Sequence, residues 1–483
     1  MKSTEAKALV VAQNPFVLGR FPGKPAPAHV FNGLVATAFG ASPVGAAVRR
    51  LLASDDPPIA DFPALKEASW VKDPARLRAF QTDLSVILNP DRRSWEAVGS
   101  LVPVHGKLAT SDPSDEGIGR ELWRLVVEVG TGTYKDELRE LLEPVDLTDP
   151  VSALADILVA GDDKRDETKV SRLPDAWFAK GISPAGSLLA SNLFNFIESL
   201  TAVDEPSRPF KLQNLGRGLY FSAVLALLLG PATRELTSKP KGLDEIAPLV
   251  VWGDVPPGSQ GDPMIDASAR SFRNAVERGR ASIALTLAEA LAAIPIASRL
   301  PKAQRGRQRL RGQMLNGGAD PDRIDKMIDN LLKQLDGQPL ADGGEREWSE
   351  QLVESLYPFE HVATGIRSMG RKVGLIGPDR GYGVPRFLVE TPLLGTIVSG
   401  LFRKGERNIP FADFVDRARI DLGLVFGPGS DETLVDRLGL WEGSGMGRKL
   451  MLQNENALRL RMIRAGLATE YSDGNTEVLN DVR

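Results

Sequence analysis

The longest apolar run in the chain, Leu219–Gly230 (LYFSAVLALLLG), most constrains how the chain can fold. The run contains no charged side chain, so it must be shielded from water. It is nevertheless too short to cross a bilayer, which requires about 20 residues. At 483 residues the chain is long enough to build a sizeable hydrophobic core. The run is therefore predicted to be a fully buried core helix.

Helical periodicity dominates the rest of the chain, and strand patterns are few. Pro248–Trp252 (PLVVW) reads as a short buried strand, and Arg120–Val129 fits either a strand or a helix. Together these patterns predict a mainly α fold with minor β, in a multidomain helical protein. The clearest predicted helices cover residues 63–69, 74–88, 134–142, 185–200, 267–294, 321–336, 347–357, 385–402 and 410–424.

Two polar segments indicate domain boundaries. Asp162–Lys169 (DDKRDETK) and Gln338–Gly344 (QPLADGG) have the composition of solvated linkers. We therefore predict an N-terminal mixed α/β domain, a central helical domain with a basic segment, and a C-terminal helical domain that ends in a winged-helix-like module. Their ranges are 1–170, 171–340 and 345–483.

The amino-acid composition excludes several kinds of catalytic and metal-binding site. The chain has no cysteine, which excludes disulfides, thiol nucleophiles and cysteine zinc sites. Its histidines, His29, His105 and His361, are too far apart in sequence to form a metal pair on one helix. The N-terminal residues lack the apolar stretch of a signal peptide. We expect a cytoplasmic protein without membrane association.

Positive charge is segregated along the chain. The chain carries a formal net charge of −4, yet Arg299–Arg311 (RLPKAQRGRQRLR) contains only basic charges. Such segregation predicts a surface that faces a polyanion, because guanidinium groups bind phosphates in a forked geometry. The candidate contacts in and before this segment are Arg299, Lys302, Arg305, Arg307, Arg309 and Arg311, with Arg270, Arg273, Arg278 and Arg280 adding to the field.

The C-terminal residues predict a helix, a second helix and then a hairpin, which is the order of a winged helix. The helices are predicted over 431–438 and 453–465, and the hairpin over 469–479 around Asp473-Gly474. Such modules serve either in DNA binding or in protein docking, and the sequence is compatible with both functions. The basic candidates are Arg459, Arg461 and Arg464 on the second helix, with Arg448 and Lys449 in the loop before it.

Catalytic motifs are weak throughout. Gly130–Lys135 and Gly443–Lys449 are glycine-rich but lack the spacing of a phosphate-binding loop. Asp156 with Glu167 and Lys169 matches part of a nuclease pattern. Such a site needs buried strands, but Glu167 and Lys169 lie in a highly polar segment. Asp254, Asp262 and Asp266 flank a loop after the predicted strand and would suit Mg²⁺ as a rival hydrolase site. We assign no catalytic residue, metal ligand or cofactor.

The region from Ile409 to Leu479 resembles the winged-helix-type ends of uncharacterised subunits of bacterial multi-gene defence systems. The resemblance is carried by Pro410-Phe411, Phe414-Val415, Leu422–Val425, the Leu458–Leu467 helix and Ser472-Asp473. It implies a partner-dependent, DNA-associated role. We therefore expect a non-enzymatic subunit of a larger assembly that contacts the phosphate backbone of nucleic acid and other protein subunits. The alternatives are a protein-docking scaffold without nucleic-acid contact, and a metal-dependent hydrolase or nuclease.

Overall fold

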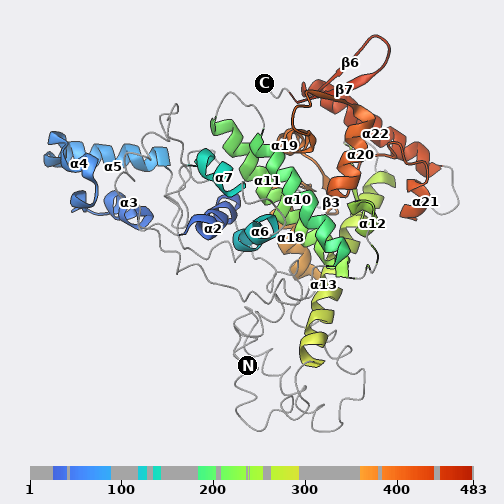
Figure 1. Ribbon diagram of the computed structural model, residues 1–483, viewed down its shortest axis with the longest axis horizontal. Helices are drawn as coiled ribbons and strands as arrows, with labels where there is room; N and C mark the ends of the chain where they lie inside the picture. The colour runs from blue at the N-terminus through green and yellow to red at the C-terminus, as the bar shows by residue number, and fades with distance from the viewer. Residues whose placement is uncertain are drawn as a thin grey trace, which may run out of the picture.

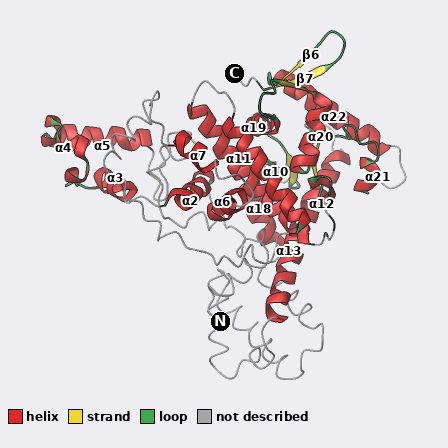
Figure 2. Ribbon diagram, viewed as in Figure 1, coloured by secondary structure: helices red, strands yellow, loops and turns green. Residues whose placement is uncertain are grey.

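The protein is described by a computed structural model, and the statements below concern only the residues that it describes. Of these residues 71% are helical and 8% lie in strands, which confirms the predicted mainly α fold with minor β (Figure 2). The described residues are 26–40, 44–88, 118–127, 134–142, 183–202, 208–234, 236, 238, 240–253, 263–292, 359–378, 383–439 and 446–480.

Figure 1 shows the arrangement of the helices and strands. The α-helices are α2 (Pro27–Phe39), α3 (Val44–Ala53), α4 (Pro63–Lys66), α5 (Pro74–Leu88), α6 (Ile118–Val127), α7 (Tyr134–Leu142), α10 (Pro184–Ala202), α11 (Arg208–Leu229), α12 (Leu243–Ile246), α13 (Pro263–Ala292), α18 (Phe359–Val373), α19 (Thr391–Leu401), α20 (Phe411–Leu422), α21 (Leu434–Leu438) and α22 (Met446–Arg464). The strands are β1 (Leu249–Trp252), β2 (Ile376–Gly377), β3 (Arg386–Leu388), β4 (Asn408–Pro410), β5 (Leu424–Val425), β6 (Ala468–Glu470) and β7 (Thr476–Leu479).

Helix α11 forms the centre of the main core and contains the apolar run singled out in the sequence. It packs against α10, α18, α19, α2 and α6. The segment Phe210–Thr233 is long and apolar enough to cross a membrane, but 89% of its most apolar stretch is buried inside the protein. This burial confirms the predicted core helix and is consistent with a soluble protein.

Two small sheets accompany the helices. In the first, with strand order β2-β3-β1-β5, β1 lies between β3 and β5 and pairs parallel to both. In the second, with strand order β4-β7-β6, all pairs are antiparallel. The hairpin β6–β7 turns at Gly474, whose φ of 83° favours glycine, as the Asp473-Gly474 pair predicts.

The predicted helices over 321–336 and 347–357 fall outside the described residues. Most of the others are confirmed, and two predictions need correction. Helix α10 begins as expected, because the Ser183 Oγ accepts the Gly186 N–H at 3.0 Å and caps it. The predicted helix over 385–402 is wrong at its start, where Arg386–Leu388 forms β3 instead. These residues form a strand because they pair with β1 and bury Phe387. Helix α19 starts only at Thr391-Pro392. Helix α22 starts earlier than predicted, so Arg448 and Lys449 lie on the helix and not in a loop.

One extended core draws buried side chains from each of the three predicted domains. It contains Phe31 from α2, Leu219 from α11 and Leu458 from α22. Helices α3, α4 and α5 instead share a separate cluster around Val48 and Phe62, and they lie apart from the other helices in Figure 1. The predicted boundary segments fall outside the described residues, so the three-domain division stays a prediction.

The turn before β4 carries an ion pair that makes stability depend on pH. Arg417 on α20 donates to both carboxylate oxygens of Glu406, at 2.6 and 2.9 Å. The hydrogen bond from Arg417 lowers the pKa of Glu406 from its ordinary value to about 2. A lowered folded-state pKa adds stability above the unfolded-state value, and this stability is lost as the pH falls toward the folded-state value.

We therefore expect Glu406→Gln to destabilise the protein by a constant amount above about pH 5, and by less and less as the pH falls to about 3. Urea unfolding of both proteins across this range measures the gap. Glu432→Gln is the matched control, because its 78% exposed carboxylate pairs with Arg448 at the surface. A gap for Glu406→Gln that does not change between pH 6 and pH 3 would contradict the assignment.

Candidate nucleic-acid interface

Helix α22 lies at the periphery of the molecule between α21 and the hairpin β6–β7 (Figure 1). Its inward residues Met451, Asn454, Leu458 and Met462 are spaced three or four apart and are at most 1% exposed. This spacing places them along one side of the helix. The helix ends at Arg464, and the chain turns away at Gly466, whose φ is 71°, with the Leu467 N–H donating back to the Met462 carbonyl at 2.9 Å.

Asn454 fastens the first half of α22 to the four-stranded sheet. Its Nδ2 donates to the carbonyl oxygens of Val251 and Phe426, at 2.8 and 2.7 Å, and its Oδ1 accepts the Gly253 N–H at 2.7 Å. These groups belong to the carboxyl ends of β1 and β5. A Cβ at Gly253 would lie 2.6 Å from the Asn454 carbonyl oxygen, so only glycine allows this approach. The carboxyl ends of these strands, where α/β proteins often bind ligands, are thus occupied by a side chain of α22.

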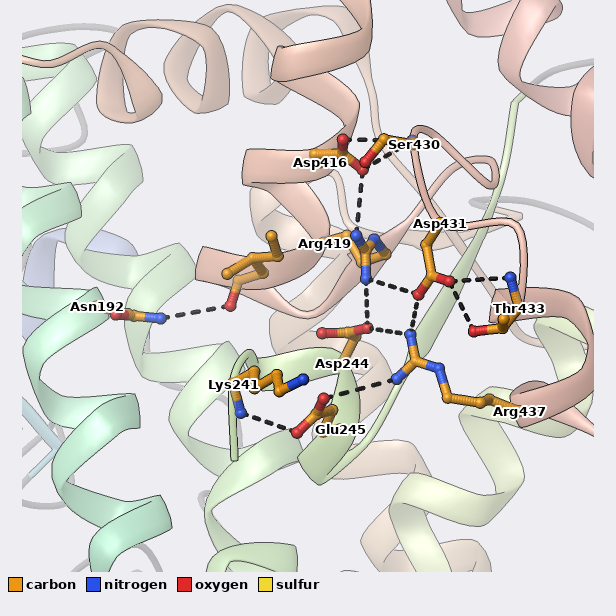
Figure 3. A network of polar contacts seen from close by, with 11 residues as sticks. Asn192, Lys241, Asp244, Glu245, Asp416, Arg419, Ser430, Asp431, Thr433 and Arg437 are labelled. Carbon is orange, nitrogen blue, oxygen red and sulfur yellow. Dashed lines mark hydrogen bonds and ion pairs between the residues drawn. The ribbon is translucent and has the colours of Figure 1, made fainter. Parts of the chain in front are cut away.

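A buried ionic network supports the segment that leads from β5 to α21 (Figure 3). Arg419 on α20 donates to Asp244 at 2.9 Å, to Asp416 at 3.2 Å and to Asp431 at 3.4 Å. Arg437 on α21 donates to Asp244 at 3.2 Å and also bonds Asp431. The Asp416 carboxylate also accepts the Ser430 N–H at 3.2 Å. The network therefore ties α12, α20 and α21 together.

The charges in this network stabilise each other. Burial disfavours the charged form of Arg419, but the hydrogen bonds from it to Asp244 and Asp416 outweigh this cost and raise its pKa. Burial also disfavours the Asp431 carboxylate, yet the hydrogen bonds from Thr433 and Arg437 hold its pKa below the usual value. Both groups are thus held in their charged forms.

The outward face of α22 is basic and carries no acid. The helix has five cationic side chains and one acidic side chain, Glu455. Glu455 is half-buried and its Oε2 accepts the Gly429 N–H at 3.0 Å, so it is turned toward the protein. Burial raises the pKa of its carboxyl. A shallow hollow of about 470 Å³ lies on the outward face, and its lining residues are Arg448, Lys449, Leu452, Gln453 and Asn456.

The structure divides the predicted basic residues of α22 into exposed and engaged ones. Arg448, Lys449 and Arg464 are exposed, and Arg448 forms a surface ion pair with Glu432 at 3.2 Å. Arg459 is engaged by Glu470 of the hairpin at 2.7 Å. Arg461 donates to the Val389 carbonyl and to the Thr391 hydroxyl, so it holds the start of α19.

The arginines of α13 are similarly divided. Arg270 and Arg273 are exposed, whereas Arg278 and Arg280 are half-buried. Arg280 pairs with Glu277 at 3.0 Å. The start of α13 and the start of α22 share one apolar cluster, in which Met264 and Ala267 meet Met451. Arg270 and Arg273 therefore come, along the helix, directly after the residues of α13 that are buried against α22.

Several predicted sites fall outside the described residues. They include the whole of Arg299–Arg311, with Arg299, Lys302, Arg305, Arg307, Arg309 and Arg311. The nuclease pattern and two of the three loop carboxylates, Asp254 and Asp262, also fall there. The third carboxylate, Asp266, is exposed in the first turn of α13. Within the described part of the chain, no three histidine or acidic side chains are grouped so that they could hold a metal ion.

Sequence reasoning missed the ionic network, Asn454 and Gln453. Arg419 and Asp244 are 175 positions apart, and no local pattern links them. Asn454 interrupts an apolar stripe at a position where a hydrophobic residue is expected, and this interruption was the available signal. Comparison of the chain with protein-family models, with curated proteins and with solved structures gives no match.

Proposed function

We propose that this protein is a non-enzymatic, nucleic-acid-associated subunit of a larger cytoplasmic assembly, and that it contacts the phosphate backbone. The observation that carries the proposal is the outward face of α22, which exposes Arg448 and Lys449 while its only carboxylate is turned inward. Proteins that bind nucleic acid collect cations on one face in this way, because phosphate neutralisation releases counterions. A place in a bacterial anti-phage defence system follows from the resemblance of the C-terminal region alone.

Helix α13 and the basic segment after it extend the proposed surface. Arg270 and Arg273 are exposed near the contact between α13 and α22. Arg299–Arg311 follows α13 in the chain and has six basic residues without an acid. In this proposal these groups neutralise and position the phosphate backbone, in a sequence-independent manner.

A second candidate function is protein docking, and the exposed leucines of α22 favour it. Leu452 is 48% exposed and Leu460 is 38% exposed on the same helix as the cations. An acidic partner with an apolar stripe would match both features. In this case the protein forms a salt-sensitive complex with another subunit and has no affinity for nucleic acid.

The test is fluorescence anisotropy of the purified protein with labelled duplex and single-stranded DNA and RNA across a range of salt. We expect binding that weakens steeply with salt. The double variant Arg448→Glu/Lys449→Glu should bind at least about tenfold more weakly at low salt and lower the logarithmic salt slope by about 2.

Arg76→Glu/Arg78→Glu is the matched control, because both arginines are exposed on α5, a helix that packs in a different hydrophobic cluster from α22. This control should bind like the unmodified protein. If the α22 variant binds as tightly as the control, α22 is not the interface. If the unmodified protein binds no nucleic acid at low salt, the docking function replaces the proposal.

A further inference from the structure

Beside its cations, the outward face of α22 exposes two amide side chains. With about 100° between successive residues, its exposed positions from Arg448 to Arg464 cover an arc of roughly 160°. Lys449, Gln453 and Asn456 lie within this arc, and all three also line the hollow. Cations alone suffice to neutralise phosphates, whereas an amide side chain can also form a bidentate hydrogen-bonded contact with the edge of a base.

Gln453 differs from the other amides of this helix in what it bonds. Asn454 is fully engaged inside the protein by Val251, Phe426 and Gly253. The Oδ1 of Asn456 accepts two hydrogen bonds from Arg459, at 3.2 and 3.0 Å. The exposed Gln453 side chain makes no hydrogen bond to any residue that the structure describes. Its carbonyl and its NH₂ group are therefore both available to a ligand from the solvent side.

We propose that α22 reads base edges in the major groove of duplex DNA, with Gln453 forming a bidentate contact to an adenine. This inference rests on the proposed function and adds sequence preference to it. A glutamine amide matches the N7 acceptor and the N6 donor of adenine, and an exposed apolar side chain such as Leu452 suits a thymine methyl group. Lys449, about one turn earlier, supplies a flanking phosphate contact, and Arg448 supplies a second one by exchanging its surface ion pair with Glu432 for a phosphate.

Duplex DNA fits this face better than RNA does. The major groove of B-form DNA is wide enough to admit an α-helix, whereas that of A-form RNA is too deep and narrow for side chains to read. A helix whose exposed arc carries two cations, two amides and a leucine in two turns matches the first groove.

The hairpin β6–β7 sets the limit of the DNA-reading face. Residues 468–480 contain the acids Glu470, Asp473 and Glu477 and no lysine or arginine. Glu470 already engages Arg459 in the second half of α22. Phosphates would be repelled there, so the reading face is confined to the first half of the helix, between Arg448 and Asn456.

The experiment is selection of binding sites from a randomised DNA duplex by the full-length protein, followed by anisotropy on the selected site and its single-base variants. We expect one adenine position whose replacement weakens binding by roughly tenfold. Gln453→Ala should abolish this difference while binding to the randomised duplex changes little. Gln453→Glu should transfer the preference to cytosine, because a carboxylate accepts from the cytosine N4 amine.

Asn274→Ala, an exposed amide variant on α13, is the control and should keep the adenine preference. Binding without any selected consensus, or a consensus that Gln453→Ala leaves intact, overturns the base-reading role and leaves the proposed function standing. Tighter binding to duplex RNA than to duplex DNA also overturns it. Absence of binding to every nucleic acid at low salt overturns both proposals. Circular dichroism of each variant shows that a changed preference is not a loss of fold.

Discussion

Arg419→Ala is expected to destabilise the protein by about 3–5 kcal/mol. The side chain of Arg419 is 8% exposed, and that of its partner Asp244 is 2% exposed. Removal of the guanidinium leaves the Asp244 carboxylate buried, with Arg437 as its one remaining cationic partner among the described residues. A buried charge that loses its partner costs more than the pair contributes, because the charge has already been taken out of water. Urea unfolding followed by circular dichroism measures the loss.

The neighbouring arginine provides the comparison. Arg437 bonds the same Asp244 and Asp431, but its side chain is 36% exposed. After its removal, water can therefore replace part of the hydrogen bonding that it provides to the two carboxylates. Arg437→Ala should therefore cost clearly less than Arg419→Ala. Arg403→Ala, at an exposed turn position, should change the free energy of unfolding by less than about 0.5 kcal/mol. Equal losses in all three variants would show that burial does not govern this network.

Asn454→Ala is expected to cost about 3–5 kcal/mol, because it leaves three buried backbone groups without their hydrogen bonds. The groups are the Val251 and Phe426 carbonyls and the Gly253 N–H, and the Asn454 side chain that serves them is fully buried. Each unsatisfied group costs roughly 1–3 kcal/mol. Because Asn454 joins α22 to the ends of β1 and β5, the loss should also loosen the first half of the helix. Hydrogen exchange at the amides of α22 measures this second effect.

Asn456→Ala is the matched control on the same helix, since the Asn456 side chain is exposed and, within the described part of the chain, bonds Arg459 alone. It should leave the unfolding free energy within about 0.5 kcal/mol of the unmodified protein. Asn454→Asp separates the two halves of the amide: it keeps the acceptor for Gly253, removes both donors and buries a charge. We expect it to be at least as damaging as Asn454→Ala. A stability for Asn454→Ala close to that of Asn456→Ala would contradict the role we assign.

Local patterns were sufficient wherever one segment decides its own structure. The apolar run of α11, the cap and proline at the start of α10, and the Asp473-Gly474 turn all act over a few residues. The predicted elements at these places are confirmed. Where pairing with a distant strand determines the secondary structure, local patterns predicted the wrong element. Arg386–Leu388 becomes a strand because β1 lies beside it, more than 130 positions earlier in the chain.

The candidate site shows the same division. The sequence by itself determined that α22 is basic and that it is followed by a hairpin. Only the tertiary structure decided which of its residues face solvent: Arg448, Lys449 and Gln453 are exposed, whereas Arg459 and Arg461 are held by the hairpin and by the start of α19.

The physical reason is the range of the interactions. Helix propensity, caps and turns depend on neighbours within about four residues and can be read directly from the chain. Whether a side chain is free to meet a ligand depends on partners that folding brings from far away, such as Val251 for Asn454 and Asp244 for Arg419. The sequence therefore determined the helices and where their charge lies, and the tertiary packing decided which part of that charge remains available.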